Sequence, residues 1–286
     1  MGLLRMIFII VSFLFISCSE DEQHIHDDDN NHDISIQITK NITYNGVSVD
    51  LFIDKPDADE FDVLMVYRGT VRRDSLILQA SQNALERFKS ILHRKDMMII
   101  SVAYPEENLL FGDNIHHAEA ALLWLKNEAE NDLDITVNKV FLAGHSQGGY
   151  LVTRLNTMHQ TDGVIANAPG PLNLVFRCHL EESGQIPNEM ECSLLYEEYG
   201  SVTTNPDAYF ERSLLNFTTG YKSDILFVQG LDDGPIHMHS WPQFKEDVES
   251  CADCQSVDFL ELPEFGHAAL FYSQEAIQEF NGFIDK

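Results

Sequence analysis

VFLAGHSQGGYLVTR, residues 140–154, is the stretch that decides how the rest of the chain is interpreted. It begins as an apolar, strand-like run, continues through a short polar segment rich in glycine, and ends with helix-forming character. A strand that passes directly into a helix needs a very sharp turn, in which side chains at Gly144 and Gly148 would collide with neighbouring backbone. The pattern therefore predicts a strand, a tight turn and a helix, with Ser146 at the tip of the turn.

Ser146 is the candidate nucleophile of this turn. We expect its hydroxyl to stand clear of the sheet, and the amide of Gln147 to lie at a helix N-terminus, where unpaired N–H groups favour developing negative charge. In this context the G-x-S-x-G pattern resembles the nucleophile elbow of the α/β-hydrolase superfamily. The resemblance implies a catalytic triad in the chain order Ser, Asp, His. The alternative is a glycine-rich turn that contains an ordinary serine.

A candidate acid follows the apolar run at residues 225–229, in the loop Gly230-Leu231-Asp232-Asp233-Gly234-Pro235. The α/β-hydrolase family usually places its acid three residues beyond the glycine, which favours Asp233. Asp232 stays open as the alternative, because a one-residue bulge would exchange the directions of the two side chains. The remaining aspartate would cap loop amides, a common role beside Gly and Pro.

The candidate base is His267, in a Gly-His pair that follows the strand-like residues 257–262 and precedes a final helical segment. This position matches the catalytic histidine of the resembled family. His145, beside the serine, is expected to point elsewhere and to be structural. His237 and His239 follow the acid loop and are candidates to line the pocket.

A second oxyanion donor is expected in the loop after residues 63–67, which reads Arg68-Gly69-Thr70. Many relatives have His-Gly at the first two of these positions. The amide of Gly69 or Thr70 is expected to point at the forming oxyanion together with that of Gln147. Arg68 departs from the pattern, and it either forms a salt bridge with an acidic neighbour or presents its guanidinium to a substrate carboxylate.

Strand and helix patterns alternate from residue 34 to the end of the chain, which predicts an α/β domain over residues 34–286. A hairpin is expected at residues 34–38 and 47–53 around Asn45-Gly46. Further strands are expected at residues 63–67, 97–103, 140–143, 163–167, 225–229 and 257–262, and helices at 81–92 and 115–130. The resemblance implies the α/β-hydrolase fold, a mostly parallel sheet flanked by helices.

The alternation disappears at about residues 171–221. In the α/β-hydrolase superfamily, an insertion at this point commonly forms a lid over the nucleophile, which implies a helical cap. Several apolar side chains are candidates to shape an acyl or aryl pocket there, or simply to pack the cap onto the body. They are Leu172, Leu174, Val175, Phe176, Tyr196, Tyr199, Tyr209 and Phe210.

Residues 1–17 contain one arginine followed by an apolar run. The run is too short to span a membrane comfortably, which predicts a signal peptide. The Phe15-Ile16-Ser17-Cys18 ending resembles a bacterial lipobox, in which the cysteine becomes the lipidated first residue. Phe15 departs from the leucine that is usual there. An ordinary signal peptide and an uncleaved anchor are the alternatives.

Residues 18–33 are rich in acid and asparagine and predict a disordered tether behind the lipid. His24, His26 and His32 are scattered in it, but a flexible segment offers no preformed metal geometry, so a solvated linker is favoured. In some Gram-negative lineages an acidic run in this position resembles a surface-export signal. We therefore expect an exported lipoprotein of the outer membrane or cell surface, with the periplasmic side as an alternative.

Five cysteines are present, and in an oxidising compartment the four beyond Cys18 can pair. Four cysteines allow three connectivities. We favour Cys178 with Cys192, which closes a loop of about 15 residues and contributes about 3 kcal/mol, together with Cys251 and Cys254 in a tight ring. A zinc or thioredoxin-like use of the last pair is disfavoured, because no second pair or suitable strand-helix context flanks it.

Charge and motifs together limit the possible functions. The 286 residues carry 18 Lys+Arg against 46 Asp+Glu, a formal net charge of −28, and such a surface repels nucleic acid. No cofactor or metal is expected. The prediction is a serine hydrolase that cleaves a small-molecule ester through an acyl-enzyme, with the membrane reached through the lipid anchor.

Two other functions stay open. A prolyl-oligopeptidase-like peptidase that acts on short peptides carries similar motifs in its catalytic module, although no propeller or other size-selecting domain is expected before this one. A non-catalytic surface protein that binds a ligand in a hydrolase-like pocket is the third possibility.

Overall fold

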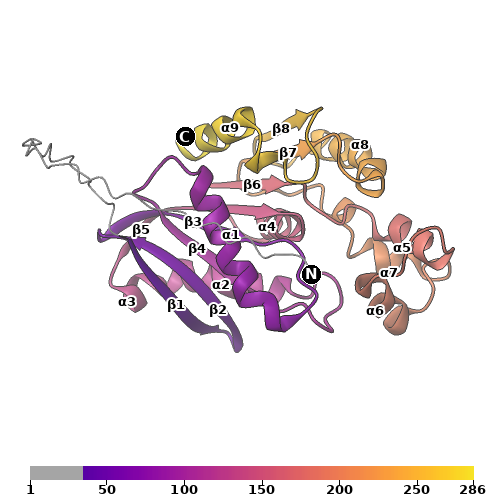
Figure 1. Cartoon of the computed structure of the whole chain (residues 1–286), viewed down its shortest axis with the longest axis horizontal. Helices are drawn as coiled ribbons and strands as arrows, with labels where there is room; N and C mark the ends of the chain where they lie inside the picture. Colours follow the sequence, from indigo (N-terminus) through magenta and orange to yellow (C-terminus); the bar gives the residue numbers. More distant parts are fainter. Residues whose placement is uncertain (1–34) are drawn as a thin grey trace, which may run out of the picture. The chain divides into compact units, whose positions relative to one another are not determined.

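An eight-stranded sheet organises residues 35–286, the part of the chain that the computed structural model describes (Figure 1). The strand order is β1-β2-β4-β3-β5-β6-β7-β8. β2 pairs antiparallel with β1 and with β4, and every other pair is parallel. The strands are β1 (Ser35–Tyr44), β2 (Val47–Pro56), β3 (Glu60–Tyr67), β4 (Met98–Ala103), β5 (Thr136–His145), β6 (Gly163–Asn167), β7 (Ile225–Gly230) and β8 (Val257–Leu262).

Helices cover both faces of this sheet. The α-helices are α1 (Ile77–Ile91), α2 (Ile115–Asn127), α3 (Ala129–Leu133), α4 (Gln147–Met158), α5 (Leu174–Glu182), α6 (Met190–Tyr199), α7 (Pro206–Phe210), α8 (Pro235–Glu249) and α9 (Gln274–Ile284). Short 3-10 turns are η1 (Asp74–Leu76), η2 (Leu214–Asn216) and η3 (Ala269–Phe271). Core residues of α1 and α9 pack on one face, and those of α2, α4 and α8 on the other.

The central strands are apolar on both sides because both faces are covered. In β3, Val63, Met65 and Tyr67 belong to the core under α2 and α4. Leu64 and Val66, which alternate with them, belong to the core under α1 and α9. The mostly parallel sheet with flanking helices that the sequence predicts is confirmed.

The edge hairpin turns at Asn45 and Gly46, which have φ angles of 49° and 83°. Two successive positive φ angles are typical of the tight turns that match the twist of paired strands. β1 and β2 are each 10 residues long, so the hairpin extends beyond the predicted strands 34–38 and 47–53. Beyond those limits the exposed face of the two strands carries polar residues, so the sequence pattern does not mark the full length of the strands.

The helix predicted at residues 115–130 is confirmed up to Asn127, where α2 ends, and the prediction is wrong only in continuing it unbroken through Glu128. Glu128 leaves the helical region with φ −127° and ψ −27°, and α3 restarts at Ala129. The break buries Ala129 in the core, so tertiary packing outweighs the helical propensity of this stretch.

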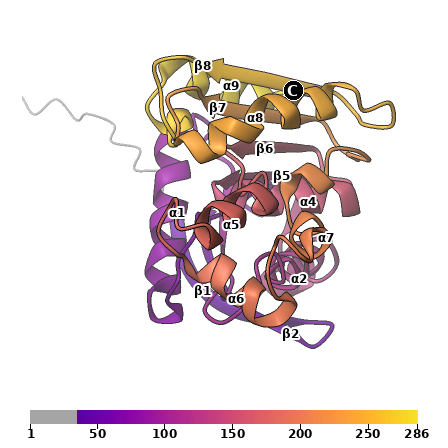
Figure 2. The same cartoon turned by 90° about the vertical axis from the view of Figure 1, so that its right-hand side faces the viewer.

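The cap consists of α5, α6, α7 and η2, inserted between β6 and β7, and Figure 2 shows its three α-helices side by side. Cys178 of α5 pairs with Cys192 of α6, the pairing that the sequence favours. Tyr209 is fully buried, but Tyr196 and Phe210 are 54% and 41% exposed. These two aromatic side chains therefore do not shape an enclosed pocket.

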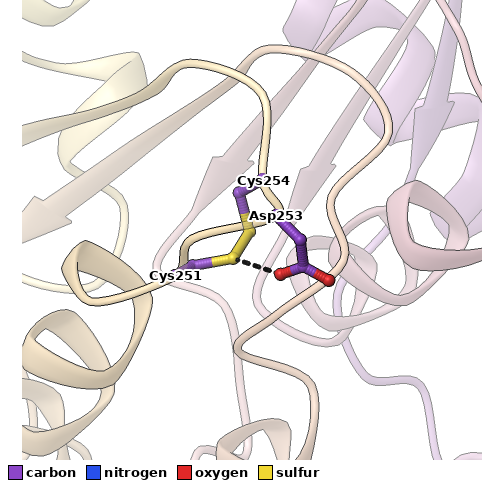
Figure 3. Close-up of side chains that lie close together, drawn as sticks. All are labelled: Cys251, Asp253 and Cys254. Atoms are coloured by element: carbon purple, nitrogen blue, oxygen red, sulfur yellow. Dashed lines mark hydrogen bonds between the residues drawn. A yellow bond between two sulfur atoms is a disulfide. The ribbon is translucent and has the colours of Figure 1, made fainter.

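Cys251 and Cys254 form the second disulfide, just after α8 (Figure 3). Asp253 Oδ1 lies 3.1 Å from Cys251 Sγ, and the three side chains have the spacing of a metal cluster. A disulfide sulfur carries neither a hydrogen nor the thiolate charge that binds a metal. The contact is therefore neither a hydrogen bond nor a metal site.

The predicted signal peptide at residues 1–17, the lipid site Cys18 and the tether at residues 18–33 lie outside the described residues. Within residues 35–286, none of the helices combines the length and the hydropathy needed to cross a membrane.

Candidate active site

The turn between β5 and α4 holds Ser146 in a strained conformation, with φ 58° and ψ −119°. Such backbone is found mainly where the surrounding structure enforces it. A Cβ on Gly144 would lie 2.1 Å from the carbonyl oxygen of Gly148, and a Cβ on Gly148 would lie 2.0 Å from the carbonyl oxygen of Tyr67. Both positions thus exclude every side chain, as the sharp turn requires.

Backbone hydrogen bonds on both sides fix Ser146. Its amide donates to the carbonyl of Asn167 at 2.9 Å, and its carbonyl accepts from Tyr150 and Gly170 at 3.0 and 3.2 Å. The Ser146 side chain lines a cavity of about 390 Å³ beneath the cap, called here the cap-side cavity. The turn therefore presents the hydroxyl at the carboxyl end of the sheet, where ligands gather in α/β folds.

His267 and Asp233 come together from the loops after β8 and β7. His267 Nδ1 lies 2.8 Å from Asp233 Oδ2, and Asp233 Oδ1 accepts from the amide of Gly234 at 2.6 Å. Burial alone would raise the pKa of Asp233, but the hydrogen bond from His267, the nearby charges and the Gly234 amide outweigh it and lower the pKa to about 2. An ionised Asp233 can only accept, so Nδ1 of His267 carries the proton.

Asp232 takes the other direction. It is exposed, and its amide donates to the carbonyl of Phe265 at 2.9 Å. Of the two candidate acids, Asp233 is thus the one in contact with His267.

Ser146 and His267 line the same cap-side cavity. Within residues 35–286, no hydrogen bond joins the Ser146 hydroxyl to the His267 ring. Contacts between a nucleophile and its base are often long in unliganded enzymes and shorten when substrate is bound. The structure therefore gathers Ser146, His267 and Asp233 around one cavity, with the histidine-aspartate contact already formed.

The candidate oxyanion donors lie beside Ser146. Gln147 is the first residue of α4, and the first N–H groups of a helix have no partner within it. A Cβ on Gly69 would lie 3.4 Å from Ser146 Cβ, so the loop after β3 packs directly against the serine. Thr70 lines the cap-side cavity.

Arg68 forms a buried salt bridge, the first of its two predicted roles. It is 3% exposed, and Nη1 lies 2.6 Å from Glu106 Oε2 while Nη2 donates to the carbonyl of Tyr104 at 2.5 Å. Glu106 Oε2 also accepts from the amide of Val71 at 2.6 Å. Burial raises the pKa of Glu106, and the charge of Arg68 opposes that rise. The pair ties the loop after β3 to the chain that follows β4.

His145 is half-buried beside the site rather than pointing away from it. Its ring centroid lies 4.9 Å from that of His267. Asn167 accepts from the Leu270 amide through Oδ1, which orients its Nδ2 to donate to His145 Nδ1 at 2.7 Å. Burial, followed by the charges of His267 and Arg87, lowers the pKa of His145 to about 3. The ring is therefore neutral at ordinary pH, with its proton on Nε2.

The two histidines after the acid loop differ. His237 lines the cap-side cavity, and its Nε2 lies 3.0 Å from Gln229 Oε1. Burial lowers the pKa of His237 to about 4. His239 stacks on Phe176 of the cap, with ring centroids 3.8 Å apart, and does not line this cavity among the described residues.

Charged residues that the sequence did not single out also line the cap-side cavity, namely Arg72 from the loop after β3 and Arg177 and Glu191 from the cap. Arg72 forms ion pairs with Glu189 and with Glu191, the latter at 3.0 Å. Arg177 pairs with Glu181 at 3.2 Å and with Glu189 at 3.3 Å. No spacing rule links these residues, although the position of Arg72 just after the Gly69-Thr70 loop is a usable signal.

A second cavity of about 410 Å³, the α1-side cavity, opens on the other side of Ser146 and His267. Both side chains line the two cavities. The wall away from the serine comes from α1 and η3 and includes Asn83, Ala84, Arg87 and Phe271. A substrate held at Ser146 can therefore extend in two directions.

The sequence matches no protein-family model, and no curated protein is significantly similar to it. Several solved structures are similar to this chain in their fold. A fungal esterase from Rhizomucor miehei superposes with a TM-score of 0.65 at 13% identity, over 88% of this chain and 84% of that one. Est1E from Butyrivibrio proteoclasticus gives 0.60 at 15% identity, over 87% and 99%.

The Pyrococcus horikoshii acylaminoacyl peptidase gives a TM-score of 0.63 at 11% identity, over 88% of this chain but only 41% of the peptidase. This chain thus spans less than half the length of that enzyme. At such low identity the likeness concerns the fold. Together with the sheet order and the turn at Ser146, it shows that the chain has the α/β-hydrolase fold, with a helical cap between β6 and β7.

Proposed function

We propose that this protein is a serine hydrolase that cleaves carboxylic esters through an acyl-enzyme. One observation carries the proposal: Ser146, on a strained strand-to-helix turn, lines the same cavity as His267, whose Nδ1 lies 2.8 Å from Asp233. A serine hydroxyl is a weak nucleophile without a base, and the base needs an acid to orient it. These three groups provide that combination.

In the proposed reaction, Ser146 Oγ attacks the ester carbonyl carbon while His267 Nε2 takes its proton. The tetrahedral intermediate expels the alcohol, which receives that proton from His267. A water molecule then repeats the sequence on the acyl-enzyme and releases the acid and free Ser146. Asp233 stays ionised throughout, because its pKa is lowered to about 2.

The backbone supplies the oxyanion site in this proposal. The amide of Gln147 and an amide of the Gly69-Thr70 loop donate to the developing negative charge. Removing one such donor typically costs about 3 kcal/mol of barrier stabilisation, on the order of a hundredfold in rate.

Esters of small acids are the proposed substrates. The cap-side cavity measures about 390 Å³ and includes the apolar side chains of Phe111, Leu172 and Leu174. The esterase from Rhizomucor miehei is covered over most of its length, which supports an esterase. The likeness to an acylaminoacyl peptidase favours a second candidate, cleavage of short peptides.

The decisive experiment labels purified protein with a fluorophosphonate probe and measures hydrolysis of short-chain p-nitrophenyl esters and aminoacyl p-nitroanilides. We expect labelling to be lost in Ser146→Ala and kept in Ser250→Ala, an exposed serine after α8. Ester cleavage alone supports the esterase, and anilide cleavage supports the peptidase. Tight ligand retention without labelling or turnover would instead indicate a binding protein.

The N-terminal sequence supports a location. We propose that the protein is an exported lipoprotein held at the outer membrane or cell surface through Cys18, with residues 18–33 as a tether. Disulfides such as Cys178–Cys192 suit an oxidising compartment. Membrane fractionation tests this proposal, because Cys18→Ala should move the protein out of the membrane fraction, whereas equal membrane recovery of both proteins would refute the lipid anchor.

A further inference from the structure

The two cavities that meet at Ser146 differ in charge. In the cap-side cavity, Arg72 and Arg177 are neutralised by ion pairs with glutamates of the cap. The α1-side cavity has no carboxylate among its described lining residues, and its arginines are Arg68 and Arg87. Arg68 is occupied by Glu106. In a chain with a formal net charge of −28, a cationic cavity beside the candidate nucleophile is an exception to the overall composition.

Arg87 is the cation that this cavity leaves available. Within residues 35–286, its guanidinium takes part in no ion pair and no hydrogen bond. It lies 4.0 Å from the ring centroid of Phe271 and 5.5 Å from that of Tyr272. Stacking on an aromatic face holds a guanidinium in place while its N–H groups remain free to donate in the plane.

The position of Arg87 connects it to the reacting groups. Phe271 packs edge-on against His145, with ring centroids 5.6 Å apart, and His145 precedes Ser146. The charge of Arg87 is one of the causes, after burial and the charge of His267, that lower the pKa of His145. Asn83 lies one helical turn before Arg87 on α1 and lines the same cavity, so its amide adds a neutral hydrogen-bonding group to the same wall.

We propose that Arg87, assisted by Asn83, binds a carboxylate carried by the substrate, so that the enzyme prefers esters with a free acid group on the side facing α1. This inference rests on the proposed hydrolase function and adds a substrate class to it. A guanidinium binds a carboxylate through two parallel N–H···O bonds, a geometry that an ammonium does not reproduce.

The test compares matched ester pairs that differ by one carboxylate. On the acyl side, p-nitrophenyl hemisuccinate is compared with p-nitrophenyl butyrate, and on the alcohol side 4-acetoxybenzoate with phenyl acetate. The readout is the ratio of kcat/KM for the charged ester to that for the neutral one. Loss of a charge-assisted contact typically reduces binding roughly 10- to 100-fold, so Arg87→Met should lower the ratio by about that factor for one of the pairs. Arg87→Lys should recover only part of it.

Lys126→Met is the matched control, because it removes one positive charge from an exposed position on α2. It should leave the ratio as in the wild type. A wild type that cleaves neutral esters without favouring either charged one overturns the carboxylate subsite and leaves the hydrolase proposal intact. An unchanged ratio in Arg87→Met also overturns it. A wild type that cleaves no ester of either kind counts against both proposals.

Discussion

His267 Nδ1 donates to Asp233 Oδ2 across 2.8 Å. The side chain of the donor His267 is 44% exposed, whereas that of the acceptor Asp233 is only 7% exposed. The buried acid therefore holds an imidazole whose other edge remains accessible to substrate. A fixed Nδ1 proton leaves Nε2 as the acceptor, which is the tautomer that a general base on a serine requires.

Asp233→Asn should abolish most of the activity, because an amide can stabilise the wrong tautomer and cannot balance an imidazolium. A comparable change in a Ser-His-Asp triad lowers kcat about 10,000-fold. Asp232→Asn is the matched control, since Asp232 is exposed and bonded to the Phe265 carbonyl through its backbone. Steady-state hydrolysis of a p-nitrophenyl ester measures both. A larger loss in Asp232→Asn would transfer the role of the acid to that residue.

Gly148→Ala should prevent folding or cost more than about 4 kcal/mol of the free energy of unfolding, a size reserved for severe steric defects. Its Cβ would lie 2.0 Å from the carbonyl oxygen of Tyr67, and neither backbone segment can move without disturbing the sheet. Gly282→Ala in α9 is the control, because within residues 35–286 a Cβ at this position would have no atom within 4 Å apart from its chain neighbours and the backbone of its own helix. That variant should gain up to about 1 kcal/mol from helix propensity.

Urea denaturation of both glycine variants measures these free energies of unfolding. Equal midpoints for Gly148→Ala and the wild type would show that the turn at Ser146 is looser than the contact implies.

The sequence predicts the sheet well because its signals are local. Buried parallel strands are largely apolar runs, so β4, β6 and β7 lie within one residue of their predicted limits. The G-x-S-x-G turn requires glycine for local steric reasons, so the role of Gly144 could be predicted without knowing which other segments pack against the turn. The end of α2 depends instead on burying Ala129, a tertiary effect that local propensity does not contain.

Within the candidate site, the sequence predicts only those residues that follow the end of a strand. Ser146, Asp233 and His267 each follow a strand, so parallel pairing brings them to one edge of the sheet. Arg87 and Glu191 come from helices far from these strand ends, and only the packing of α1 and the cap brings them to the cavities. Their roles depend on side-chain pairing, which residue spacing does not encode.

Glu106→Gln should lower both stability and activity. It leaves the buried Arg68 without its counter-charge, a defect that typically costs 3–5 kcal/mol, and weakens the acceptor that holds the Val71 amide at 2.6 Å. The double variant Arg68→Met/Glu106→Met should recover stability, because two apolar side chains can replace a buried ion pair. It should not recover kcat, since the Val71 amide still lacks its acceptor and the neighbouring Gly69-Thr70 loop, the proposed oxyanion donor, is free to shift.

Thermal unfolding and ester hydrolysis separate the two effects of the Glu106 variants. Full recovery of kcat together with stability would mean that the ion pair serves folding alone and does not position the Gly69-Thr70 loop.

Acid should weaken the folded protein through His237. Its pKa falls from 6.5 to about 4 on folding, chiefly because the ring is buried. Between these two values the unfolded chain binds the proton and the folded protein does not, so the free energy of unfolding decreases as pH falls through this window. A shift of this size amounts to roughly 2.5 kcal/mol between pH 7.5 and pH 4.5.

His237→Gln should remove that part of the pH dependence, whereas His179→Gln, at an exposed position on α5, should keep it. Urea midpoints at the two pH values provide the comparison, and identical pH slopes for the wild type and His237→Gln would contradict the assignment.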